Sequence, residues 1–198
     1  EVASHGYAHR LVSEMTPQTF ELDVKKSIDI LQAIISKKVN GFRARSFSIT
    51  RETLWALEVL DKLNLRFDSS IIDREARFLE SKNRFPGRIM HHEFLEFPIN
   101  TTTVMGKSIC ISGGIIMRML PFPLYLRLLK TSESFKTSGV FYCHVWEFNR
   151  DQPKRRTRPL QTIAQSPSFY TTETKLRKLS HIYNFVSVND FLKKRHTP

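Results

Sequence analysis

The stretch Glu1–Phe47, EVASHGYAHRLVSEMTPQTFELDVKKSIDILQAIISKKVNGFRARSF, decides the fold class, because strand, helix and strand patterns follow one another within it. Glu1–Ser4 has the pattern of a strand end. Thr16–Lys37 predicts a helix, since it opens with a threonine N-cap and a proline and then keeps apolar residues at helical spacing. Val39–Phe47 predicts a short strand that runs through an Asn-Gly pair into a loop.

The same alternation continues along the rest of the chain. Further strands are predicted at Leu65–Ile71, Phe94–Ile99, Gly139–Phe148 and Phe185–Val188. Further helices are predicted after the cap residue Thr50, at Leu120–Leu129 and at Thr171–His181. The polar segment Asp73–His92 is predicted to be loop. Strands that alternate with helices indicate an α/β fold with mostly parallel strands, and 198 residues suit a single domain over 1–198.

The composition is that of an ordinary soluble globular protein, with 40% hydrophobic and 25% charged residues. The longest apolar stretch, Ile109–Leu120, is too short and too interrupted to cross a membrane. Cys110 and Cys143 lack the CxxC spacing of a metal or redox site, so we expect buried free thiols.

The charge balance is strongly basic, with 31 Lys and Arg against 19 Asp and Glu and a net charge of +12. Such an excess favours polyanionic partners, whether nucleic acid, an acidic polysaccharide or an anionic membrane. The basic clusters Lys154–Arg158 and Lys193–Arg195 are predicted to be a solvated loop and tail. Aromatic residues do not alternate with these clusters as a nucleic-acid stacking surface would require, so we expect no nucleic-acid partner.

Polar motifs follow several predicted strands, where α/β proteins place their functional sites. They are SHGYAH at 4–9, GFRARS at 41–46, DSS at 68–70 and HVWE at 144–147. Two histidines four residues apart, His5 and His9, can bind one divalent metal ion through neutral imidazole nitrogens. That spacing alone is a weak signal, and two unrelated surface histidines would also produce it.

Taken in order, SHGYAH, GFRARSFSIT, FDSSI, EFPI and FYCHVWEF resemble the polysaccharide deacetylases of the NodB-like carbohydrate esterase family. The resemblance covers essentially the whole chain and is strongest to a branch found beside exopolysaccharide loci in Gram-negative bacteria. It implies a partial, distorted (β/α) barrel that hydrolyses N-acetyl groups on hexosamine units of an exopolysaccharide. It also implies a bacterial protein, expected in the cytoplasm with the periplasm as the alternative.

The resemblance implies roles for residues that match the family's motifs. His5 and His9 correspond to ligands of Zn²⁺ or another divalent metal, and His144 to the general acid. Arg43 corresponds to the arginine that orients a catalytic aspartate. Three further residues are expected to contact the substrate or to support the site, namely Trp146 and Tyr7 for the substrate and Asp68 for support.

The chain also departs from the family pattern. The family's first motif, an aspartate pair that supplies the base and a third metal ligand, precedes the histidines and is not found here, so we expect a domain truncated at its amino terminus. The carboxylates considered as substitutes are Glu1, Asp68 and Glu147. Arg45 and Val145 stand where the family has proline, which fixes the backbone φ angle.

These departures keep two other functions open. One is a catalytically inactive carbohydrate-binding relic, in which Trp146, Tyr7 and Phe47 would stack on sugar rings. The other is a basic nucleic-acid-binding protein, which only the net charge of +12 favours. Binding of nucleic acid would weaken steeply with salt and would not depend on His5.

Overall fold

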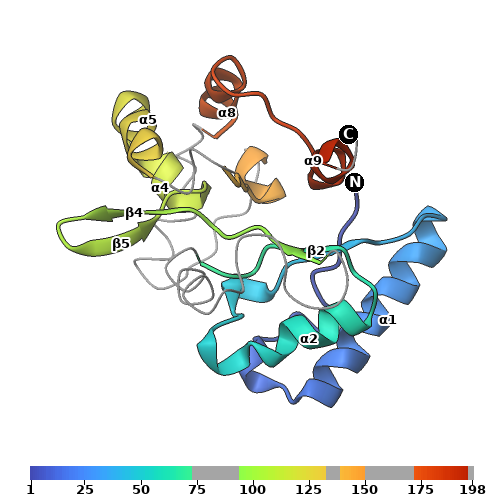
Figure 1. The fold of residues 1–198 in the computed structure, drawn as a ribbon. Coiled ribbons are helices and arrows are strands. Elements are labelled where there is room, and N and C mark those ends of the chain that lie inside the picture. Colours follow the sequence, from blue (N-terminus) through green and yellow to red (C-terminus); the bar gives the residue numbers. More distant parts are fainter. Residues whose placement is uncertain (73–93, 133–138, 150–171, 196–198) are drawn as a thin grey trace.

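A small parallel sheet lies at the centre of the first part of the fold (Figure 1). The computed structural model describes residues 1–72, 94–132, 139–149 and 172–195. The strands of the sheet are β1 (Gly41–Phe42), β2 (Phe67–Asp68) and β3 (Leu95–Glu96), paired in that order and all parallel. Ser4 adds an isolated parallel bridge to Phe42 at one edge. The α/β class and the parallel pairing are therefore confirmed, whereas the described residues form no closed barrel.

Helices α1 (Pro17–Ile35) and α2 (Trp55–Lys62) pack against this sheet and against each other. The predicted first helix is confirmed, because Thr16 accepts a hydrogen bond from the Thr19 backbone at 3.3 Å and Ser36 ends the helix in a left-handed conformation. Three short 3₁₀ helices precede or connect these elements, η1 (Val12–Glu14), η2 (Arg45–Phe47) and η3 (Arg51–Thr53). The shared core contains Phe20, Val24, Ile28, Phe42, Leu57 and Leu60.

A second apolar cluster contains Phe67 of β2 and Leu192 of helix α9 (Val188–Arg195). The prediction of a strand at Phe185–Val188 is wrong, because α9 begins at Val188. Lys193 and Lys194 are exposed, as predicted, although they lie in this helix and not in an irregular tail. The Ser187 hydroxyl accepts a hydrogen bond from the Asp190 backbone at 3.1 Å, which is an N-cap contact and turns the chain into a helix.

A third cluster lies beside an antiparallel hairpin, β4 (Thr101–Val104) and β5 (Lys107–Cys110), which the sequence did not predict. Met105 and Gly106 join its strands, and both have positive φ angles, as a tight hairpin turn requires. Three helices follow it, α4 (Gly114–Met119), α5 (Phe122–Thr131) and α8 (Thr172–Ser180). The last two confirm the helices predicted at Leu120–Leu129 and Thr171–His181, whereas α4 was not predicted. The buried residues of this cluster are Ile111, Met117, Tyr125, Leu129 and Leu179.

The strand predicted at Gly139–Phe148 is not observed. A single bridge joins Tyr142 to Gly113, and residues 145–148 form the 3₁₀ helix η4 (Val145–Phe148). The reason lies in side-chain acceptors that replace a neighbouring strand. Asn100 Oδ1 accepts the Val140 N–H at 2.7 Å, and Glu147 Oε1 accepts the His144 N–H at 3.1 Å.

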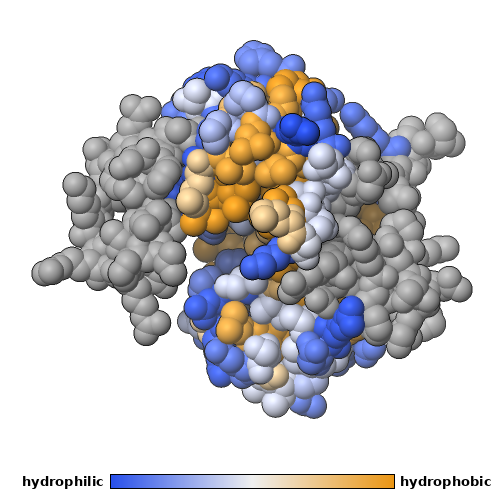
Figure 2. Space-filling view, turned by 90° about the vertical axis from the view of Figure 1, so that its left-hand side faces the viewer, coloured by the Kyte–Doolittle hydropathy of each residue, from blue (hydrophilic) through white to orange (hydrophobic). Residues whose placement is uncertain are grey.

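Apolar side chains gather on the face that carries α4 and α5 (Figure 2), where Ile115, Met119 and Leu124 are exposed. In the part of the chain that the structure describes, no helix is long and apolar enough to cross a membrane. Cys110 and Cys143 are free thiols, as predicted, although both are half-buried. The loops predicted at 73–92 and 154–158 lie outside the described residues.

Candidate active site

The loop that carries His5 and His9 is held by helix α1. Both carboxylate oxygens of Asp23 accept backbone N–H groups of this loop, those of Tyr7 and Ala8, each at 2.9 Å. Gly6 has a φ angle of +79°, and a Cβ there would lie 2.9 Å from Asp23 Oδ2. Glycine is therefore required where the loop turns over the carboxylate.

The two histidines converge as the motif predicted, with ring centroids 5.0 Å apart. His5 Nδ1 lies 2.5 Å from the Arg43 carbonyl oxygen, so Nδ1 carries the proton and Nε2 offers a lone pair. Burial lowers the pKa of His5, and the positive charges of His9 and Arg43 act in the same direction. The ring is thus suited to bind as a neutral imidazole.

Arg43 is fixed by the DSS motif at the end of β2. Its Nε donates to the Ser69 carbonyl at 3.0 Å, and a terminal nitrogen donates to the Ser69 hydroxyl at 2.8 Å. Ser70 accepts the Ala44 N–H at 2.7 Å and donates to Asp68 Oδ1 at 2.5 Å. The motif therefore positions both the side chain and the backbone of the arginine loop, with Asp68 buried beneath.

His144 lies at the start of η4 and is half-exposed, while Glu147 below it is buried. Glu147 Oε1 lies 2.9 Å from His144 Nδ1, and the Trp146 ring stacks on the imidazole at a centroid distance of 5.2 Å. Tyr142 contacts both halves of the site, because its ring lies 5.9 Å from that of His144 and 5.9 Å from the Arg43 guanidinium carbon.

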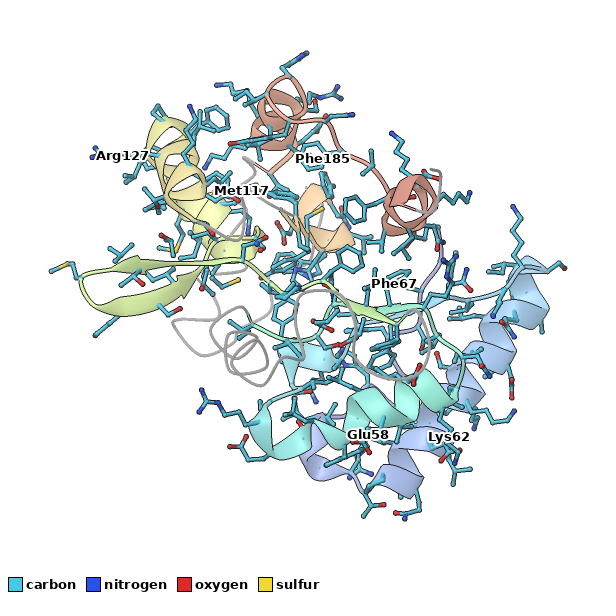
Figure 3. The ribbon with its side chains drawn as sticks, viewed as in Figure 1. Glu58, Lys62, Phe67, Met117, Arg127 and Phe185 are labelled. Atoms are coloured by element: carbon cyan, nitrogen blue, oxygen red, sulfur yellow. The ribbon has the colours of Figure 1, made fainter. Side chains whose placement is uncertain are left out.

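A cavity of about 1120 Å³ brings these groups together. His5, His9, Arg43, Trp146 and His144 all contribute to its wall. The rest of the wall comes from segments far apart in the sequence, among them Phe67 on β2 and Phe185 ahead of α9 (Figure 3). Residues from both ends of the chain therefore build one pocket.

Of the two residues that were expected to contact the substrate, one lines the cavity and the other does not. Trp146 lines the cavity. Its ring stacks on His144, and the Arg118 guanidinium carbon lies 4.7 Å from the ring centroid. Tyr7 is exposed and outside the cavity wall, with Lys26 Nζ 3.8 Å above its ring. The structure therefore groups Trp146, but not Tyr7, with the three histidines.

The residues present match a zinc site in kind but not in number. His5 and His9 offer two imidazoles, whereas zinc sites in proteins use at least three protein ligands. Among the described residues, no third His, Cys, Asp or Glu joins them. The carboxylates considered as substitutes are engaged elsewhere, since Glu1 accepts the Asn189 N–H at 2.9 Å, and Asp68 and Glu147 lie under Arg43 and His144.

Several residues of the site escaped the sequence reasoning. Asp23 lies in no motif and acts through its hydrogen bonds to the histidine loop. Glu147 was considered only as a substitute metal ligand, and its contact with His144 was not predicted. For Tyr142 the sequence held a usable signal, the glycine pair Gly113-Gly114. A Cβ on Gly113 would lie 2.0 Å from the Tyr142 carbonyl oxygen, so only glycine fits there. A glycine pair before a helix thus marked the place where another segment comes close.

Comparison with known proteins gives a family match for each part of the chain. Residues 1–67 match the family model described as Polysaccharide deacetylase, and residues 70–193 match the one described as Domain of unknown function (DUF3473). The Peptidoglycan deacetylase-like protein FGM2 of Gibberella zeae is 27% identical over 86 residues. That alignment covers 43% of this chain, and it spans only 25% of the relative's length.

The fold and the site together define an α/β protein whose histidines and arginine face one cavity, a residue set suited to hydrolysis. The chain belongs to the DUF3473 family, whose model matches more than half of it, and its first 67 residues match the polysaccharide deacetylase family.

Proposed function

We propose that the chain forms the histidine-containing part of a metal-dependent deacetylase that removes N-acetyl groups from hexosamine units of a bacterial exopolysaccharide. The observation that carries this proposal is the convergence of His5, His9, Arg43 and His144 on one cavity. A volume of about 1120 Å³ leaves room for a sugar unit and its neighbours. The match to polysaccharide deacetylases over residues 1–67 supports the substrate class.

His144 is suited to the role of general acid. Its Nδ1 faces Glu147, so Nε2 is free to point toward a substrate in the cavity. When the amide C–N bond breaks, the Nε2–H bond breaks as well and the proton passes to the departing amine nitrogen. The acyl carbon keeps the oxygen that came from water, and the products are acetate and a free amino sugar.

Arg43 contributes a fixed positive charge at the wall of the same cavity. The two hydrogen bonds to Ser69 hold the guanidinium in one orientation, so it needs no rearrangement when negative charge develops nearby. His5 and His9 would hold the metal ion through their ring nitrogens. Bound there with a third ligand, such an ion would polarise the acetamide carbonyl and would lower the pKa of a water molecule on it. A third ligand and the base must come from outside the described residues.

The direct test is a calorimetric titration of the protein with Zn²⁺, run beside a variant with both His5→Ala and His9→Ala. We expect one-to-one binding that the double substitution abolishes. His181→Ala, a change at an exposed histidine after α8, is the matched control and should bind as the unchanged protein does. Binding that does not depend on His5 and His9 would overturn the metal site.

Acetate release from an N-acetylglucosamine oligomer tests the reaction itself. We expect release that requires added metal and that is lost in the variant with both His5→Ala and His9→Ala. Oligomer binding without any acetate release would instead indicate a carbohydrate-binding relic.

A further inference from the structure

A buried carboxylate lies behind the proposed general acid. The side chain of Glu147 is 0% exposed, whereas that of His144 is 54% exposed. Oε1 of Glu147 accepts two hydrogen bonds from the same residue, one from His144 Nδ1 at 2.9 Å and one from the His144 backbone at 3.1 Å. Ring and backbone are therefore fixed by one oxygen atom.

The second oxygen is held by two other elements. Oε2 of Glu147 accepts the Thr172 hydroxyl from α8 at 3.0 Å. It also lies 3.6 Å from Arg118 Nε on α4, an ion pair between side chains that are 0% and 7% exposed. Because both oxygens have partners on rigid elements, the carboxylate has little freedom to rotate.

These contacts also set the charge of Glu147. Burial by itself would raise the pKa of the carboxyl group. The hydrogen bonds from His144, the positive charge of Arg118 and the Thr172 hydroxyl outweigh burial and hold the pKa of Glu147 below its usual range. The group is therefore a carboxylate at neutral pH, and acts as an acceptor only.

We propose that Glu147 is the positioning residue for His144. Through the contacts of Glu147 with Arg118 and Thr172, the DUF3473 region would then contribute to catalysis by fixing the general acid. The inference rests on the proposed deacetylase function, in which His144 is the acid. After His144 gives up its Nε2 proton, the neutral ring must keep its proton on Nδ1. Glu147 accepts a hydrogen bond from that atom, so it stabilises the tautomer that the reaction produces.

The origin of the network supports this assignment. Arg118, Glu147 and Thr172 all lie within residues 70–193, the region matched by the family of unknown function. His5, His9 and Arg43 lie in the region matched by the deacetylase family. The second region thus supplies the acid together with the carboxylate that orients it.

The first test does not require activity. Nitrogen NMR of the imidazole rings distinguishes the two neutral tautomers of His144. We expect the Nδ1–H form to dominate in the unchanged protein and a mixture in Glu147→Gln, because a glutamine side chain can donate to Nδ1 as well as accept from it. Thr172→Val should give a smaller change, since it removes one of the contacts that fix the carboxylate.

The control is Glu173→Gln, which neutralises an exposed carboxylate on the same helix as Thr172 and should leave the His144 signals unchanged. An unchanged tautomer in Glu147→Gln would overturn the positioning role, whether or not the protein hydrolyses acetamides.

The second test uses turnover. Glu147→Gln should lower kcat by about 10- to 100-fold with little change in KM, because it affects the acid and not substrate binding. Glu147→Asp, which keeps the charge, should recover part of the loss. Activity that is absent from the unchanged protein, combined with the expected NMR result, would count against the proposed function and not against Glu147. Equal kcat in Glu147→Gln and the unchanged protein would overturn the inference.

Discussion

Two buried carboxyl sites lie behind the candidate active site, and they hold their protons differently. Asp68 and Glu96 face each other in the register of β2 and β3, beneath Arg43. Glu147 stands alone beneath His144, with Arg118 beside it. Buried carboxyl groups thus lie beside an arginine in both places. Arg43 lies above a pair of them, whereas Arg118 lies beside a single carboxylate.

The difference comes from the neighbours. Burial raises the pKa of Glu96 well above its usual value, and the adjacent Asp68 raises it further. Burial also raises the pKa of Asp68, although hydrogen bonds and Arg43 oppose the rise. Two carboxylates this close cannot both ionise, so the pair shares a proton at neutral pH. Glu147 has no acidic neighbour of this kind among its contacts and is ionised.

The largest expected effect follows from removing the cation above the pair. Arg43→Met should lower the free energy of unfolding by about 3 kcal/mol at pH 8, because it leaves a buried negative charge without its partner. The loss should be smaller at pH 5, because the pKa values of both carboxyls are raised and protonation at lower pH removes the buried negative charge. Urea unfolding at several pH values measures it, with Arg45→Met as the exposed control. An equal loss at pH 5 and pH 8 would show that the carboxyl pair is not the partner of Arg43.

A smaller loss is expected at the single carboxylate. Glu147→Gln should lower the free energy of unfolding by about 2 kcal/mol at pH 7, since Arg118 stays buried without its counter-ion. The pKa of Glu147 is depressed in the folded protein, so its stabilisation is present above the unfolded pKa and is lost as the pH falls through the folded one. The variant and the unchanged protein should therefore converge in acid, and a constant gap would contradict the assignment.

The opposite sign is expected at the pair. The pKa of Glu96 is raised in the folded protein, so the stability that it contributes is present below the unfolded pKa and is lost as the pH rises through the folded one. Glutamine cannot titrate, so Glu96→Gln should gain about 1 kcal/mol over the unchanged protein above neutral pH. Thermal unfolding across pH measures this gain. Glu58→Gln, on the exposed side of α2 (Figure 3), should show none.

The two halves of the chain also differ in how far the sequence predicts them. Thr16–Lys37 carries its own cap and period, so α1 was predicted almost to the residue. The hairpin over 101–110 and the segment 139–148 were not. In the latter, Asn100 and Glu147 side chains satisfy backbone N–H groups that a strand would otherwise pair, and such contacts leave no periodic signal.

The candidate site shows the same division. His5, His9, Arg43 and His144 belong to ordered motifs, and the structure places all four around one cavity. Their supporting carboxylates were harder to assign, because Asp68 and Glu96 become neighbours only through the register of two strands. The role of Asp23 likewise depends on how α1 docks beneath the loop.

The smallest expected effect concerns Val145, which lies in η4 between His144 and Glu147. Val145 is 89% exposed at the first position of η4, a position where the resemblance to the deacetylase family predicts proline. His144 before it has φ −93° and ψ 143°, an extended conformation that a following proline requires. A first helical position also suits the fixed φ of proline, so Val145→Pro should raise the free energy of unfolding by about 0.5 kcal/mol through the unfolded state.

The kinetic consequence of Val145→Pro follows from the same geometry. Proline would restrict the backbone beside His144 without touching the Glu147 contacts, so kcat should rise by less than about 3-fold and KM should stay unchanged. Because η4 already holds the ring through Glu147, a large gain in kcat would mean that the backbone, and not the carboxylate, limits the position of His144. Measuring kcat of Val145→Pro in the Glu147→Gln background separates the effect of the backbone from that of the carboxylate. The proline should restore part of the lost kcat there, whereas it should have little effect while Glu147 is present.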